Sequence, residues 1–414
     1  MVTHGDRARP PGVARALAPI VSFTMALAGS YSPTLFAETT PGGEVFLSLA
    51  ESVDAKGIDP IESGTIAGVR FSLDAARGES LKASARVSLD SSAGLALDRA
   101  YLKARLLRET GGSALRLTLG KAPLSWGKGF LLNAGDPIFG AAPRVTALSS
   151  DEYRTSTAWM ASAYVPFGAF SFAEAVAIPR VGAGNAYQDA GTDEGSEATV
   201  ARAIAGSENP DNRAGCRALV TPGWGALQSA EAGFLASDQE TLGAYVAFDG
   251  SLVIDWYGAL SARWDNAYTG PQTPELALSF GLFRIFSIVP GRQLAARAET
   301  LAYPAANREL WYLELILGLT DDLSVFARGI VATGRAVSRI EEEAASGDAI
   351  GNAQGALSAL PWLASGSALA SVGFSWVLLN DITLSGGALL RIGKGDEEQT
   401  VPGLTVQAGF TCAF

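Results

Sequence analysis

The chain has 414 residues, a hydrophobic share of 48% and a formal net charge of −11. After residue 37 the hydrophobic residues are dispersed in short groups, and no clean helix-length apolar block stands out. Because a membrane-spanning helix needs about 20 consecutive apolar residues, this composition argues against a bundle of such helices.

The amino end predicts an export signal. Three arginines precede an uncharged stretch from Ala16 to Ala37 with a short apolar centre, which is the pattern of a secretory signal. Cleavage after Ala28 fits the small-x-small rule, but the polar chain begins directly after Ala37, so we favour Ala37. The alternative is a disordered amino end. We therefore expect a signal over residues 1–37 and one domain over residues 38–414.

Two neighbouring segments then alternate strictly between apolar and polar residues. From Leu81 to Leu89 the polar row is Lys82, Ser84, Arg86 and Ser88. From Arg99 to Leu106 it is Arg99, Tyr101, Lys103 and Arg105. A charge facing lipid would cost roughly 2 to 4 kcal/mol at mid-depth, so these rows must face a wet interior. The segments are also longer than the strands of about 5 to 6 residues that are commonest in soluble sheets.

The same alternation predicts an all-β fold, a single antiparallel transmembrane barrel with short periplasmic turns and long extracellular loops. Strands are expected near residues 43–50, 64–74, 80–90, 97–107, 114–121, 156–166, 169–178, 226–236, 240–248, 251–264, 275–286, 292–303, 308–319, 323–334, 366–379, 382–392 and 402–413. Bacterial single-chain barrels have an even number of strands. Either one of these seventeen strands is wrongly assigned or one strand is missed, and we expect the error before residue 237, inside residues 179–225. The expected total is sixteen or eighteen, about 16 within a range of roughly 14 to 18.

The predicted connections fall into two length classes. Tight turns are expected at Pro166-Phe167-Gly168, Asp321-Asp322 and Asn380-Asp381, and long loops over residues 122–155, 179–225, 335–365 and 393–401. Three of the long loops carry acidic clusters, which are Asp189, Asp193, Glu194 and Glu197; Glu341, Glu342 and Glu343; and Asp396, Glu397 and Glu398. Such clusters ordinarily keep an exterior soluble.

Residues 80–121 reverse the acidic balance of the chain, with eight basic and three acidic residues. Rings of Lys or Arg in a pore favour anions. The predicted pore-lining residues are Lys82, Arg86, Arg99, Tyr101, Lys103, Arg105 and Arg116. The alternative is that acids on other strands neutralise them, for example Asp255, Glu299 and Glu314.

The next segment, Gly120 to Gly129, carries the most chemical character. Pro123 ends the strand ladder, and Gly127 and Gly129 permit backbone angles that other residues avoid. The run Gly-Lys, Trp-Gly-Lys-Gly, then Asn and Asp resembles a motif of porin-like barrel families, in which a loop folds into the pore. Those families usually place Pro after the Asn, where this chain has Ala134. The resemblance implies a constriction loop with Lys121, Ser125, Trp126, Lys128, Asn133 and Asp136. Strand capping and membrane-girdle packing are the alternative roles.

The carboxyl end alternates as well. Leu404, Val406, Ala408, Phe410, Cys412 and Phe414 form an apolar row that ends in an aromatic residue. This end resembles bacterial outer-membrane barrels, whose last strand typically ends in Phe and is recognised by the barrel-insertion machinery. Phe410 and Phe414 are therefore the predicted assembly signal. The uncharged segment from Ala349 to Asn380 is long enough for a helix, but its glycines, its proline and its alternating second half favour a strand.

Catalysis and metal binding are not expected. The only histidine is His4, in the predicted signal, and the only cysteines are Cys216 and Cys412. Outer-membrane enzymes, as families, use a catalytic His, the side chain that titrates near neutral pH. Cys216 is expected in an outer loop and Cys412 facing lipid, which would preclude a disulfide. No cofactor and no nucleic-acid partner are expected.

We therefore expect an outer-membrane channel for passive or weakly selective passage of small hydrophilic solutes, with anions as candidates. Its partners would be outer-membrane lipid, the insertion machinery and the solutes. Two other classes stay open: a hydrophobic-solute transporter, and an adhesin or assembly scaffold that uses the long loops. The strands leave no room for an amino-terminal plug domain.

Overall fold

The structure is a computed structural model. It describes residues 38–54, 60–77, 80–90, 94–106, 115–124, 126–134, 157–168, 170–181, 212–223, 225–238, 241–264, 273–334, 368–379, 382–392 and 402–413. The predicted export signal and the three acidic clusters lie outside these residues.

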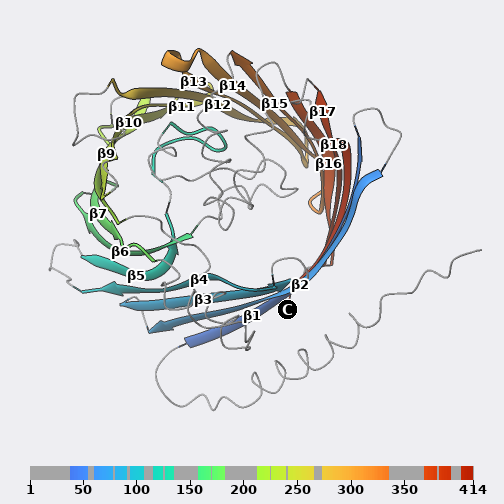
Figure 1. The fold of residues 1–414 in the computed structure, drawn as a ribbon, viewed down its shortest axis with the longest axis horizontal. Helices are drawn as coiled ribbons and strands as arrows, with labels where there is room; N and C mark the ends of the chain where they lie inside the picture. The colour runs from blue at the N-terminus through green and yellow to red at the C-terminus, as the bar shows by residue number, and fades with distance from the viewer. Residues whose placement is uncertain are drawn as a thin grey trace, which may run out of the picture.

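The described residues form eighteen strands that close into one barrel (Figure 1). Each strand pairs antiparallel with the next, and the last pairs with the first, from Glu44 opposite Ala413 to Val53 opposite Leu404. The strands are β1 (Glu38–Asp54), β2 (Pro60–Arg77), β3 (Leu81–Asp90), β4 (Gly94–Arg105), β5 (Arg116–Pro123), β6 (Thr157–Pro166), β7 (Phe172–Ile178), β8 (Arg213–Val220), β9 (Leu227–Ser237), β10 (Leu242–Ser251), β11 (Asp255–Trp264), β12 (Glu275–Val289), β13 (Arg292–Tyr303), β14 (Arg308–Gly318), β15 (Leu323–Gly334), β16 (Ala368–Leu379), β17 (Ile382–Ile392) and β18 (Pro402–Ala413), with a short helical turn, η3 (Pro304–Ala306), after β13. The predicted barrel is confirmed, with eighteen strands where we expected about sixteen.

The missed strand is β8, which lies inside the stretch where the error was expected. This strand corrects the placement of Cys216, which lies in the sheet opposite Ala175 and Phe234 rather than in an outer loop. Its side chain is exposed on the outward face. Cys412 lies on the outward face of β18, opposite Val45 and Ile382. Both cysteines are free.

The two faces of the wall differ in exposure, as β14 shows most clearly. Trp311 and Leu313 point outward and are 51% and 53% exposed, whereas their neighbours Leu310 and Tyr312 point inward and are 2% and 3% exposed. Alternate residues of a strand point to opposite faces, so this difference gives the direction of each row. The outward row is apolar, as contact with lipid requires.

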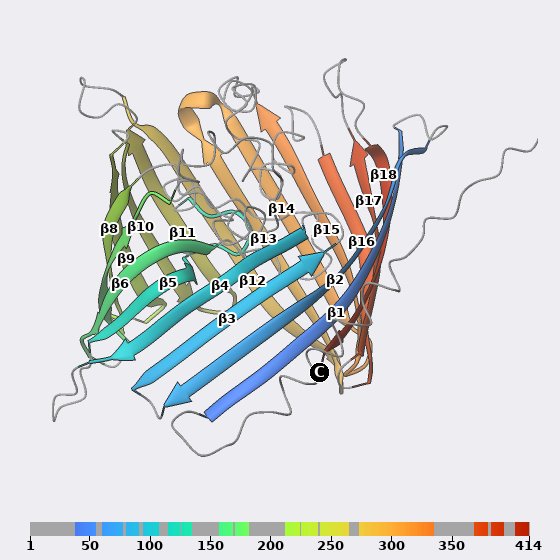
Figure 2. The same ribbon diagram turned by 60° about the horizontal axis from the view of Figure 1, so that its bottom comes forward.

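Connections sort by end, because antiparallel strands alternate in direction. The four predicted long loops follow β5, β7, β15 and β17, so all leave the same end of the barrel. The three predicted tight turns follow β6, β14 and β16, at the other end. Figure 2 shows the strands β1 to β4 crossing the wall obliquely. In the described residues, no helix is long and apolar enough to span a membrane.

Candidate functional site

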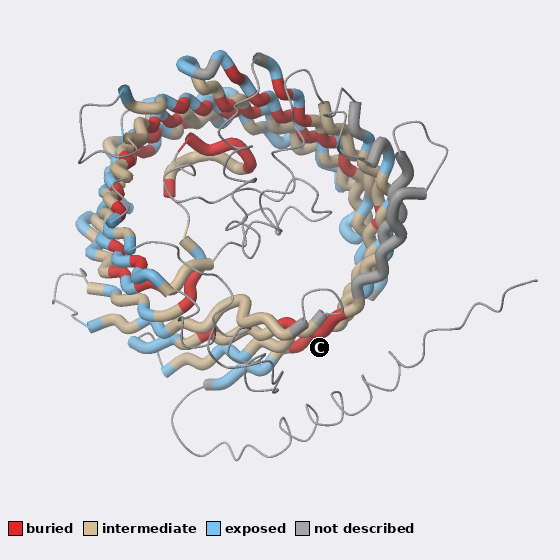
Figure 3. The backbone as a smooth tube through the Cα atoms, in the orientation of Figure 1, coloured by how far each residue is buried: buried red, intermediate tan, exposed pale blue. Residues whose placement is uncertain are grey.

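The segment after β5 folds into the barrel instead of lying outside it. Figure 1 shows it inside the ring of strands, on the side of β10 to β13. Trp126, Leu131 and Ala134 are each at most 1% exposed. They join a buried cluster with residues of the opposing wall, among them Leu310 and Tyr312 of β14. Figure 3 shows this inward segment as buried or intermediate, whereas buried and exposed residues alternate along the wall beside it.

Two glycines and one asparagine give the inward segment its shape. Gly127 and Gly129 have φ values of +86° and +150°, a region that residues with a Cβ rarely adopt. The Asn133 amide donates to the Trp126 carbonyl at 2.7 Å and so closes the bend. A Cβ on Gly127 would lie 2.7 Å from Asn133 Oδ1. The glycines and Asn133 of the motif thus form one compact turn.

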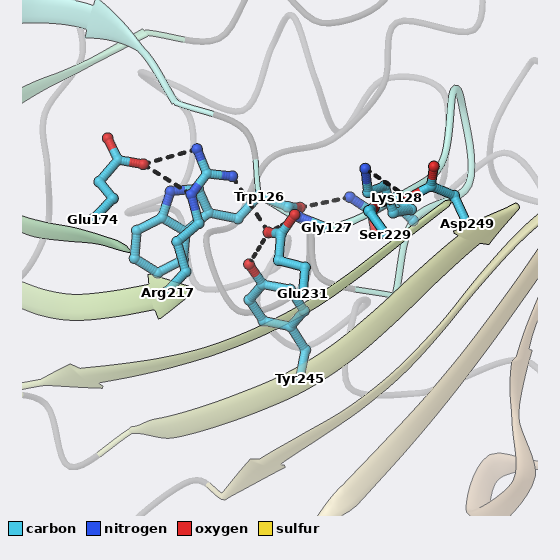
Figure 4. Close-up of polar contacts among 10 residues, drawn as sticks. Trp126, Gly127, Lys128, Glu174, Arg217, Ser229, Glu231, Tyr245 and Asp249 are labelled. Atoms are coloured by element: carbon cyan, nitrogen blue, oxygen red, sulfur yellow. Dashed lines mark hydrogen bonds and ion pairs between the residues drawn. The ribbon is translucent and has the colours of Figure 1, made fainter. Parts of the chain in front are cut away.

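The first anchor of this turn is Glu231 of β9, drawn in Figure 4. Its carboxylate accepts hydrogen bonds from the Gly127 amide at 3.1 Å, from the Tyr245 hydroxyl, and from the Arg217 guanidinium at 3.3 Å. Arg217 of β8 also binds Glu174 of β7 at 2.7 Å. The Arg217 guanidinium lies 5.3 Å from the centroid of the Trp126 ring, within cation–π range.

Lys128 supplies a second link to the same wall. Its ammonium lies 2.9 Å from Asp249 Oδ1 of β10, and Asp249 also accepts the Ser229 hydroxyl (Figure 4). The only described charge of the turn is therefore paired with the wall.

The second anchor is Glu299 of β13, which binds three consecutive backbone amides of the inward segment. The distances are 2.6 Å from Phe130, 2.8 Å from Leu131 and 2.7 Å from Leu132. The Tyr257 hydroxyl donates to the same carboxylate. Hydrogen bonds to a charged group contribute about 1.5 to 3 kcal/mol each. The Ala134 amide donates to Ser279 Oγ at 3.1 Å, which fixes the end of the turn.

Beyond Glu299, charges alternate across three strands. Arg297 of β13 binds Glu314 of β14 at 2.9 Å, and Arg328 of β15 binds the other carboxylate oxygen at 2.8 Å. The Arg297 guanidinium lies 3.4 Å from the centroid of the Phe130 ring and 4.7 Å from that of Phe283. Two arginines on this side of the lumen therefore share the carboxylate of Glu314.

The predicted pore-lining residues lie on the same inward face, in β3 to β5. Arg105 is opposite Arg116, and the row continues through Tyr164 and Glu174 to Arg217, which contacts the inward turn. This row therefore faces the interior. Lys103, Tyr101 and Arg99 lie two, four and six residues before Arg105 in β4 and therefore share its inward face. Lys82 and Arg86 of β3 are opposite Lys103 and Arg99 and face the same way.

Unlike the charges around Arg217, these basic groups have few partners. Arg99 lies 3.9 Å from Asp74, and both side chains stay substantially exposed. Lys103 and Arg116 lie over the rings of Tyr101 and Tyr164 at 5.0 and 5.3 Å.

The three acids named above as possible partners of the basic residues of β3 to β5 do not pair with them. Glu299 and Glu314 serve the inward segment and two other arginines, and Asp255 faces inward from β11, opposite Phe283 and Ser251. In the described chain, no ion pair is formed by Lys82, Arg86, Lys103 or Arg116.

The remaining predicted residues fall in different places. Lys121 belongs to β5 and is buried, with its ammonium donating to the Leu97 carbonyl at 2.6 Å, so it is part of the wall. Phe410 faces outward in β18, between Leu47 and Leu384. Ser125, Asp136 and Phe414 lie outside the described residues.

Glu231 and Arg217 were not singled out from the sequence, and their inward position in alternating strands is the only signal for them.

Known proteins resemble this chain in structure and not in sequence. No protein-family model matches it, and neither does any curated protein sequence. The outer membrane protein OprD from Pseudomonas aeruginosa has a TM-score of 0.54 and 10% identity, over 93% of this chain and 95% of OprD. OccK10 (OpdN) from the same organism has a TM-score of 0.54 and 11% identity, over 91% and 99%. OpdQ, also from P. aeruginosa, has a TM-score of 0.52 and 9% identity, over 91% and 98%. The likeness shows that this chain has the barrel fold of these proteins.

Proposed function

We propose that this protein is a channel of the bacterial outer membrane that passes small hydrophilic solutes and prefers anions. The observation that carries the proposal is the division of the interior. The inward segment is fixed to β9, β10, β12 and β13, while Lys82, Arg86, Lys103 and Arg116 lie on the facing wall and form no ion pair among the described residues. In a ring of eighteen, β4 and β13 are nine strands apart, which places them opposite each other.

Two features support membrane residence and conduction. The outward residues Trp311 and Leu313 of β14 are apolar and exposed, as lipid contact requires. The basic row of β3 to β5 and the charges around the inward segment face the interior. The inward segment narrows the lumen from one side, and fixed Lys and Arg in a narrow passage attract anions. A hydrophobic-solute transporter would need an apolar lining, which the charged inward face of β3 to β5 disfavours.

For assembly, we propose that β18 carries the signal for the insertion machinery, with Phe410 and Phe414 as its aromatic residues. The pairing of β18 with both β17 and β1 supports this role, because the strand that carries the signal is the one that closes the barrel.

The test is conduction in planar bilayers. The purified protein should form channels whose reversal potential in a KCl gradient shows anion preference. Replacing Arg86, Arg99, Lys103 and Arg105 with Gln should shift that potential toward cations. Arg284→Gln, which removes an outward cation from β12, should leave it unchanged. Absence of channels would refute conduction, and unchanged selectivity in the fourfold variant would refute the basic lining.

A further inference from the structure

Glu299 is bound by an unusual set of donors. Three successive amides, from Phe130, Leu131 and Leu132, converge on its two oxygens together with the Tyr257 hydroxyl. Successive backbone amides that point to one place form an anion-binding concavity. The side chain is 2% exposed, so water does not replace these donors.

The charge of Glu299 is balanced by these donors and not by a cation. The other two buried acids near the loop each bind arginine: Glu231 binds Arg217, and Glu314 binds Arg297 and Arg328. Glu299 forms no ion pair with any of the described residues. Its carboxylate is therefore dedicated to the inward segment.

The middle of the segment also packs against the wall, through the Phe130 ring on Arg297 and through Leu131 in the buried cluster. The other polar contacts described above, however, lie at its two ends. Gly127 and Lys128 are tied to Glu231 and Asp249, and Ala134 is tied to Ser279. Between them, Glu299 is the acceptor for all three middle amides. Loss of the carboxylate would leave these amides unsatisfied, and the middle of the segment would move to find water or other acceptors.

We propose that Glu299 is the positioning residue that sets the width of the channel, and that the three amides form an anion site which a free small carboxylate occupies when the Glu299 side chain is removed. The proposal rests on the proposed channel function and identifies the group that holds its constriction. A carboxylate suits the site because its two oxygens can accept several donors at once.

The test uses Glu299→Ala in the full-length protein, with single-channel conductance measured in planar bilayers. The conductance should rise by about twofold or more as the segment leaves the lumen. Replacing chloride by formate at constant ionic strength should return it toward the wild-type value with a saturable concentration dependence. The matched control is Glu44→Ala, because Glu44 also lies on the inward wall but binds only Arg70. Its conductance should show no formate response beyond that of the wild type.

Each result decides the inference. Wild-type conductance in Glu299→Ala, or raised conductance that formate does not lower, would overturn it while leaving the channel function intact. Absence of channels in the wild type would overturn the channel function itself. If Glu299→Ala does not assemble, Glu299→Gln provides the measurement. Its amide group keeps the shape but presents a donor to the loop amides, so conductance should rise, and an unchanged value would overturn the proposal.

Discussion

The two sides of the barrel interior use the same residue types for different purposes. On the side of β7 to β15, arginines and glutamates are buried or partly buried and are paired with one another around the inward segment. On the side of β3 to β5, Lys82 and Lys103 are exposed, Arg86 is half-buried, and none of the three forms an ion pair among the described residues. A charge that is saturated by neighbours contributes structure, and a charge that is left unsaturated is available to a passing solute. The identity of a residue therefore does not tell which role it has, whereas its partners do.

The sharpest test of this comparison makes the same substitution in a buried pair beside the inward segment and in an exposed pair of β1 and β2, next to the basic strands. Glu314→Gln leaves Arg297 and Arg328 without their counter-charge and should lower the free energy of unfolding by about 3 kcal/mol, the lower end for removal of one partner of a buried pair, since Arg297 keeps some access to water. Glu44→Gln removes the partner of Arg70 in a pair that is more than a quarter exposed. It should cost under about 1 kcal/mol. Denaturant titration of the refolded barrel in detergent measures both, and equal losses would contradict the division.

A smaller effect is expected at the turn of the inward segment. Gly127→Ala places a Cβ 2.7 Å from Asn133 Oδ1 at a φ of +86°, and should cost about 2 kcal/mol of stability. Gly168→Ala is the matched control, because Gly168 has a φ of +81° with no atom within 4 Å of an added Cβ. It should cost about 1 kcal/mol through the backbone angle alone. Only Gly127→Ala should also alter conductance, and a change with Gly168→Ala would show that the effect is not local to the inward segment.

The smallest effect concerns salt. The screening length falls from about 8 Å at 0.15 M to about 3 Å at 1 M, so the anion preference due to the basic side should weaken as salt rises. The buried contacts of Glu299 and Glu231 are screened much less. Reversal potentials at a fixed concentration ratio measure the first effect. The fourfold Gln variant should show little salt dependence, and a dependence equal to that of the wild type would assign the selectivity to other groups.

Strand positions were predictable because lipid on one side and water on the other impose alternation. The prediction missed β8, whose outward residues Ala214, Cys216 and Ala218 are small. Its alternation therefore gives little contrast in hydrophobicity. Because β8 was missed for this reason, Cys216 was predicted to lie in a loop.

The site was predictable only in part. Gly127, Gly129 and Asn133 mark the turn locally, because a tight bend needs particular residues within a few positions of one another. Its anchors are not local. Glu299 and Glu231 are inward positions like many others in their strands, and the curvature of the closed barrel determines that they meet the segment after β5. The sequence accordingly suggested Glu299 only as one possible neutralising acid for the basic residues, and its role as an acceptor for backbone amides was not predicted.

The distance along the chain between the inward segment and its anchors has a consequence for the order of assembly. The Gly127 amide is 104 residues from Glu231, and the Phe130 amide is 169 residues from Glu299. Contacts this far apart in sequence form only after the intervening chain has been organised, and they are slow to form. The segment after β5 can therefore dock fully only when β9 and β13 are both in the sheet. A sheet without β13 would have nothing to accept the middle amides of the inward segment, even with the basic strands in place.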